Sequence, residues 1–136
     1  MEPEILGRVK KLARKAKVVF VATANKKGIP HLAASEGVTF VDGDRIFFRA
    51  WFCLRTVENL RENQRLSLAI LDPKTLKGFQ ILGEMERIEK GAILDGYAPE
   101  TEKKWVGLPQ AEHQLLIRVK EILHLTSGPH SDEALD

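Results

Sequence analysis

The chain has 136 residues, 43% hydrophobic and 29% charged, which indicates one globular domain rather than a disordered segment. The formal net charge of +2 at pH 7 is too small to indicate nucleic-acid binding by itself. A single cysteine, Cys53, excludes an internal disulfide framework and is typical of a reducing compartment. The apolar run Val18–Ala24 is far shorter than the ~20 residues of a membrane helix. We therefore expect a cytoplasmic protein with neither nucleic acid nor membrane as a partner.

The first predicted element is an amphipathic helix over residues 4–16. Apolar residues recur at helical spacing from Ile5 to Ala16, and arginines and lysines fill most of the other positions. We interpret the basic positions as a solvated face above a core-packing stripe. A membrane-surface helix is the alternative, but the segment lacks the Trp or Phe that such helices often insert.

Extended segments follow in close succession. Residues 18–24 have the composition of a buried strand, and residues 25–28 carry a turn signal. Residues 29–41 are expected to continue as an extended segment. The Asp-Gly-Asp at 42–44 is a strong hairpin signal, and it predicts a return strand over residues 45–52.

The second half of the chain alternates between strands and connecting segments. The pattern predicts a short helix at about 54–61, followed by strands at about 65–71 and 79–88. A mixed and partly helical segment over residues 89–106 leads to a final strand at about 112–125. The alternation of the last strand slips near Glu121, which predicts a β-bulge. The polar, acidic residues 131–136 are expected to form a loose tail.

These elements amount to about six short strands and two or three helices. Because the first three strands follow one another directly, the order favours an antiparallel barrel or sandwich over a doubly wound parallel sheet. Residues 1–130 are expected to form a single domain.

A candidate anion site lies where the 45–52 strand gives way to the short helix. Arg55 and Thr56 would occupy the first helical turn, which has unpaired amide donors and a partial positive charge. A guanidinium adds a fork of donors that matches phosphate oxygens, and a hydroxyl adds a compact donor. Arg49 on the preceding strand would converge on the same place. Arginines are also common at helix starts, so spacing alone leaves a purely structural role open.

Aromatic and amide side chains near this helix extend the hypothesis to a flat ring. Trp51 and Phe52 would either cover a ring system or pack in the core. The amide of Gln80 offers a donor and an acceptor suited to the edge of a heterocycle. Cys53 is interpreted as a small buried apolar residue. No histidine pair has metal-ligand spacing, so no metal is assigned.

The run from Trp51 to Ile88 resembles the flavin-nucleotide-binding proteins related to pyridoxamine 5'-phosphate oxidase. Their pattern is similar to Phe-Phe-Gly-Lys-Thr-x-x-Asn-Leu, a strand, Asp-Pro, a loop and Gly-Tyr-Gln-Ile-x-Gly. In this chain Arg55 takes the lysine position and Phe79 replaces the tyrosine. The matching positions are Thr56, Asn59, Leu60, Asp72, Pro73, Gly78, Gln80, Ile81 and Gly83. The resemblance covers most of residues 4–130.

The resemblance implies a mainly β fold, a six-stranded antiparallel split β-barrel with two to four flanking helices. It further implies a homodimer that binds FMN between its subunits. Arg55 and Thr56 would hold the phosphate with help from Arg49, and Gln80 would contact the ring or ribityl chain. The second strand would contribute contacts from Ala34, Ser35, Glu36 and Gly37. Trp51 and Phe52 would border the groove, and Trp105 would reach the flavin from the neighbouring subunit.

The same resemblance implies an FMN-dependent oxidoreductase that uses a small-molecule electron donor or acceptor. Oxidation of vitamin B6 itself is not expected, because the oxidases carry Ser-Arg-Lys where this chain has Leu54-Arg55-Thr56, and their C-terminal substrate motifs are not visible. The alternatives are a non-enzymatic FMN carrier or electron-transfer module, or a relative that binds deazaflavin or haem. No catalytic side chain is assigned.

Overall fold

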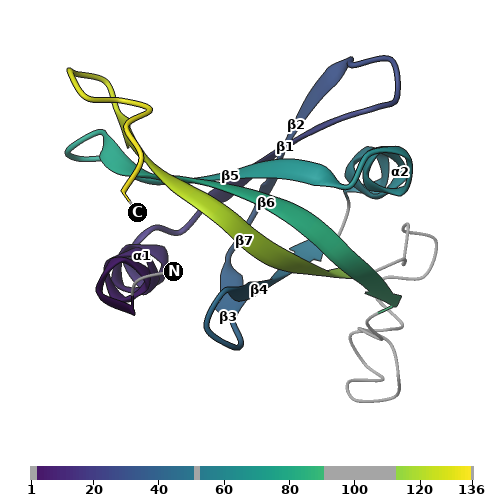
Figure 1. The fold of residues 1–136 in the computed structure, drawn as a ribbon, viewed down its shortest axis with the longest axis horizontal. Coiled ribbons are helices and arrows are strands. Elements are labelled where there is room, and N and C mark those ends of the chain that lie inside the picture. The colour runs from purple at the N-terminus through teal and green to yellow at the C-terminus, as the bar shows by residue number, and fades with distance from the viewer. Residues whose placement is uncertain (1–2, 51–52, 91–112, 136) are drawn as a thin grey trace, which may run out of the picture.

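The computed structural model describes residues 3–50, 53–90 and 113–135. Seven strands form one antiparallel sheet in the order β2-β1-β5-β6-β7-β4-β3, with two helices (Figure 1). In chain order the elements are α1 (Pro3–Lys15), β1 (Val19–Ala24), β2 (Pro30–Ser35), β3 (Val38–Phe40), β4 (Arg45–Ala50), α2 (Leu54–Glu62), β5 (Arg65–Asp72), β6 (Lys77–Lys90) and β7 (His113–Thr126). The predicted mainly β, antiparallel fold is confirmed.

The sheet must curl, because its two edge strands are consecutive in the chain. Only Glu36 and Gly37 separate β2 from β3, yet these strands lie at opposite ends of the strand order. The Ser35 hydroxyl donates a hydrogen bond to the backbone carbonyl of Arg49 at 3.0 Å, which joins the end of β2 to β4. The single extended segment predicted over 29–41 is therefore two strands, and the sheet has seven strands rather than six.

The core lies inside the curled sheet and is closed by a helix at each end. Along β5, Leu66, Leu68 and Ile70 alternate inward while the residues between them face outward. The helix α1 packs its apolar stripe against β5 and β6, with Val9 fully buried. The helix α2 packs against β1, β2 and β4, with Leu60 fully buried. The two helices lie at opposite ends of the sheet (Figure 1).

Two glycines of the family-like pattern are explained by close strand packing. A Cβ at Gly78 would lie 1.9 Å from the backbone oxygen of Ile70 on β5. A Cβ at Gly83 would lie 2.8 Å from the backbone oxygen of Arg118 on β7. Both positions therefore need glycine for the backbone to approach its neighbour, whatever the protein binds.

The β6–β7 pair contains two register shifts. Leu82 pairs with Glu121 and Gly83 with Val119, so one residue of β7 has no counterpart. This irregularity confirms the bulge predicted near Glu121 from the slip in hydrophobic alternation. The second shift falls on β6 between Met85 and Arg87, and it leaves Glu86 as the extra residue.

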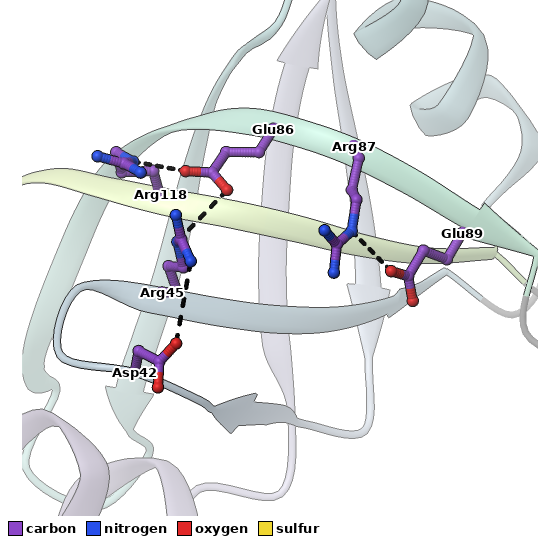
Figure 2. Close-up of polar contacts among 6 residues, drawn as sticks. All are labelled: Asp42, Arg45, Glu86, Arg87, Glu89 and Arg118. Carbon is purple, nitrogen blue, oxygen red and sulfur yellow. Dashed lines mark hydrogen bonds and ion pairs between the residues drawn. The ribbon is translucent and has the colours of Figure 1, made fainter.

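Glu86 on β6 forms an ion-pair cluster with Arg118 on the neighbouring strand β7 and with Arg45 on β4, the strand beyond β7 (Figure 2). Arg118 Nε lies 2.5 Å from Glu86 Oε1, and Arg45 Nε lies 3.4 Å from Glu86 Oε2. Arg45 also lies 3.9 Å from a carboxylate oxygen of Asp42 in the hairpin turn. The hydrogen bond from Arg118 is the main cause that lowers the pKa of Glu86 below its usual value, with the charge of Arg45 adding to it.

The last described residues fold back along β7 instead of forming the loose tail expected for 131–136. The backbone amide of Leu135 donates to the carbonyl of Ile122 at 3.0 Å, and Ala134 forms a β-bridge with Leu123. Leu135 also packs against the hydrophobic core. Backbone hydrogen bonds to β7 and the packing of Leu135 together hold this turn in place.

Most of the partly helical segment predicted at 89–106 falls outside the described residues, and its first two residues belong to β6. Neither described helix is long and apolar enough to span a membrane.

Candidate functional site

The start of α2 combines an exposed guanidinium with a buried hydroxyl. Arg55 is exposed, and Thr56 is fully buried in the first turn. Residue Cys53, at the N-cap position, makes no side-chain capping bond, and the first turn contains no acidic residue. Thr56 Oγ1 has no hydrogen-bond partner among the described residues. A helix start has amide donors and a partial positive charge that favour an anion, so the anion site expected here from the sequence stays a prediction.

A cavity of about 380 Å³ opens beside this turn and is named the Arg55 cavity. It lies between α2 and the β1–β2 hairpin, and its lining includes His31, Arg55 and Glu58. His31 Nδ1 is buried without a hydrogen-bond partner among the described residues. Glu62 also lines the cavity, where its carboxylate accepts a hydrogen bond from the backbone amide of Lys26 at 3.0 Å. The cavity is thus polar, with charges of both signs.

A second cavity, named the Arg49 cavity, gathers four of the predicted site residues. It has a volume of about 240 Å³ at the β2–β3 junction, and its lining includes Ser35, Glu36, Gly37 and Arg49. Arg49 does not line the Arg55 cavity. The expected convergence of Arg49 and Arg55 on one anion is therefore not seen among the lining residues of either cavity.

Gln80 and Ala34 lie apart from both cavities. Gln80 faces the outer side of the sheet, where its amide nitrogen donates to the Ser67 hydroxyl at 2.9 Å. Ala34 is exposed on β2, and its backbone carbonyl lies 3.9 Å from the Cys53 thiol. Cys53 is half-buried and packs against the core.

The aromatic site residues predicted from the sequence, Trp51, Phe52 and Trp105, lie outside the described residues.

A buried hydrogen bond fixes α2 relative to the sheet. Asn59 Nδ2 donates to Thr23 Oγ1 at 3.1 Å, and both residues are buried. Asn59 matches the family-like pattern, and this contact gives it a structural role. His31 pairs with Thr23 across β1 and β2, which turns its ring toward the same helix. The placement of His31 beside α2 could not be predicted from the sequence, because it depends on this strand pairing.

No group of three or more His, Cys, Asp or Glu residues suitable for a metal ion occurs in the part of the chain that the structure describes.

Comparison with known proteins identifies the family. An uncharacterized protein of Methanocaldococcus jannaschii is 28% identical over 120 residues, which cover 87% of this chain and 79% of that protein. HupZ of Group A Streptococcus has a similar structure, with a TM-score of 0.66 and 20% identity, over 98% of this chain and 99% of that one. A structure described as an FMN-binding protein from Syntrophomonas wolfei gives a TM-score of 0.62 and 16% identity, over 90% of each chain.

The two solved structures establish the likeness in fold. The family follows from the sequence, because residues 5–123 match the family model described as pyridoxamine 5'-phosphate oxidase. This match covers most of the chain and confirms the resemblance seen in the motifs around Arg55 and Gln80. The chain belongs to the pyridoxamine 5'-phosphate oxidase family.

Proposed function

We propose that the protein binds FMN between two copies of the chain and acts as an oxidoreductase for a small-molecule electron donor or acceptor. The observation that carries this proposal is the start of α2, where the Thr56 hydroxyl, which has no hydrogen-bond partner among the described residues, lies next to Arg55 in a first turn that receives no side-chain capping bond from Cys53. Membership of the family supports a flavin nucleotide as the ligand, and so does the FMN-binding protein of similar fold.

The donors at the start of α2 fit a phosphate group. The guanidinium of Arg55 would bind its oxygens in a forked geometry, and the first-turn amides would add further donors. Burying a hydroxyl without a partner costs about 1–3 kcal/mol, and a hydrogen bond to phosphate would remove that cost. Thr56 has no exposed surface in the single chain, so this contact requires a small opening at the start of α2.

The positions of Arg55 and Gln80 support a site shared between two copies. Gln80 lies on the outer face of the sheet, whereas Arg55 lines a cavity at the α2 end. On the outer face, Phe20 of β1 and Gln80 of β6 both pair with Ala69 of the strand between them. The side chain of Phe20 is 41% exposed and that of Leu32 is 63% exposed. A second copy would cover these apolar side chains. The flavin phosphate would then rest on one copy and its ring near Gln80 of the other.

FMN would supply the electron-transfer chemistry when bound, and the described residues would bind and orient it. Oxidation of pyridoxamine phosphate is not proposed, because Leu54 and Thr56 stand where the oxidases have serine and lysine.

A titration with FMN and riboflavin tests the phosphate site. Arg55→Ala should weaken FMN binding about 10- to 100-fold, the loss expected for a charged hydrogen bond, and should change riboflavin binding little. Arg61→Ala is the matched control, since Arg61 lies in the last turn of α2 and lines neither cavity. Equal weakening of both ligands by Arg55→Ala would remove the phosphate role.

Two further measurements test the assembly and the activity. Light scattering should give the mass of a dimer, and Phe20→Glu should shift it toward the monomer. Reduced nicotinamide should bleach the bound flavin if the protein is a reductase. Retention of FMN without bleaching by either nicotinamide would instead favour the electron-carrier alternative.

A further inference from the structure

A basic concave surface lies at the end of the barrel opposite α2. This surface, named the α1 hollow, has a volume of about 500 Å³ and lies between α1, the β5–β6 turn and the first residues of β6. Neither Arg55 nor Arg49 contributes to it. The residues that give it its charge and its apolar wall are Arg8, Lys11, Lys15, Asp72, Lys77 and Phe79.

The single carboxylate of the α1 hollow is already neutralised. Lys15 Nζ lies 3.1 Å from Asp72 Oδ2, and Asp72 Oδ1 accepts the backbone amide of Lys74 at 2.9 Å. The bond from the Lys74 amide, followed by that from Lys15, lowers the pKa of Asp72 below its usual value, so this carboxylate is ionised and satisfied at neutral pH.

Three cations of the α1 hollow have no counter-ion among the described residues. Arg8, Lys11 and Lys77 form no ion pair within the described ranges, although they line the same surface from α1 and β6. Like charges that converge on one concavity repel each other, and a bound anion would relieve this repulsion.

An aromatic ring holds one of these cations in place. The guanidinium carbon of Arg8 lies 5.5 Å from the ring centroid of Phe79, which is buried in the wall of the hollow. A cation–π contact orients the guanidinium without using its N–H donors. Arg8 is thus held in position and keeps its full hydrogen-bonding capacity for a ligand.

We propose that the α1 hollow binds a small, multiply charged anion, such as a phosphorylated metabolite. The cations surround one concave surface instead of following an extended stripe, which a nucleic-acid backbone would require. The net charge of +2 is also low for a nucleic-acid-binding domain. The site is separate from the proposed FMN phosphate site, so either one can fail without the other.

Titration with inorganic pyrophosphate, followed by backbone amide NMR at low salt, tests this proposal. Amide shifts should move in residues 8–15 and 75–79. The double variant Arg8→Gln/Lys77→Gln should weaken the affinity for pyrophosphate at least about 10-fold, and Lys11→Gln should weaken it by a smaller factor. Among the described residues Lys11 makes no contact with an aromatic ring, so Lys11→Gln removes a charge without removing a cation–π contact.

Lys10→Gln is the matched control. Lys10 lies on the same helix and also stacks over an aromatic ring, 5.8 Å from the centroid of Phe40, but it does not line the α1 hollow. It should leave the pyrophosphate affinity unchanged. An equal loss in Lys10→Gln, or shifts confined to the start of α2, would overturn the proposal. Tighter binding of a single-stranded oligonucleotide or of phosphatidylserine vesicles through the same residues would also overturn it, in favour of a nucleic-acid or membrane surface.

Discussion

Arg118 Nε lies 2.5 Å from Glu86 Oε1 at the point where Glu86 has no partner in the β6–β7 register. Glu86, the extra residue of the bulge, therefore contacts β7 through its side chain although its backbone has no pairing partner on that strand (Figure 2). The same contact lowers the pKa of Glu86 and raises that of Arg118. Glu86 thus joins β6 to β7 and, through Arg45, to the β3–β4 hairpin.

The stability that this contact contributes should depend on pH. A carboxylate whose pKa is lowered on folding stabilises the protein above its unfolded pKa, here near 4.5, and loses this effect as the pH falls through the folded pKa. Glu86→Gln should therefore lower the urea midpoint at pH 7, and the difference from the wild type should disappear as the pH falls below 4.5. Glu84→Gln is the control, because Glu84 lies 3.8 Å from Lys120 and should show a smaller effect. A difference that stays constant with pH would show that the ion pair is not responsible.

Two Gly→Ala substitutions should change stability in opposite directions. Gly78→Ala places a Cβ 1.9 Å from the backbone oxygen of Ile70, so β5 and β6 must separate, and we expect a loss of about 3 kcal/mol or more. Gly7→Ala adds a Cβ with no atom within 4 Å on an exposed helical position, and it should stabilise α1 by about 0.5–1 kcal/mol. Thermal unfolding of the two variants measures both effects. Equal effects would contradict the close approach of β5 and β6.

Thr56→Val should separate stability from binding. Valine has nearly the same shape as threonine but removes a buried hydroxyl that has no partner among the described residues. The variant should be at least as stable as the wild type, with a gain of up to about 1–3 kcal/mol in the free energy of unfolding. Its affinity for FMN should nevertheless fall. Loss of stability together with unchanged FMN binding would assign Thr56 to the structure alone; Thr56→Ser, which keeps the hydroxyl, should retain binding.

The buried pair Asn59 and Thr23 should behave as one unit. Asn59→Ala leaves the Thr23 hydroxyl without its partner and should cost about 1–3 kcal/mol in the free energy of unfolding. Adding Thr23→Val removes the group left unsatisfied, so the double variant should lose less stability than the sum of the two single variants. Urea unfolding of the four proteins measures the coupling. Strict additivity would show that the hydrogen bond contributes nothing to the docking of α2.

Local patterns in the sequence predicted most of the fold. The alternation of Leu66, Leu68 and Ile70 marked β5, and the slip before Ile122 marked the bulge, because apolar residues report which way a strand faces. The division of residues 29–41 into β2 and β3 was missed. The two strands lie at opposite edges of the sheet, and the residue types at positions 36 and 37 do not indicate that the chain changes its neighbouring strand there.

The candidate site was predicted only in part. The sequence correctly placed Arg55 and Thr56 in the first turn of α2, but it did not reveal that Thr56 is fully buried. Burial of Ile46 and Phe48 on β4 turns Arg49 outward, toward a cavity that Arg55 does not line. The basic positions of the helix predicted over residues 4–16 were interpreted as a solvated face, and the α1 hollow was not predicted. Its concavity depends on the β5–β6 turn, which packs beside α1 only after the sheet has formed.

The curled sheet and its two helices also bear on how relatives with this fold can diverge. Val9 and Leu60, fully buried at opposite ends, fill the interior from α1 and α2. The Arg55 cavity, the Arg49 cavity and the α1 hollow are formed mostly by exposed or half-buried side chains; the buried exceptions in their linings are Asn59, Asp72 and Phe79. Ligand preference can therefore evolve by substitutions at the rim without creating internal voids, so a change of cofactor within this architecture need not impair folding.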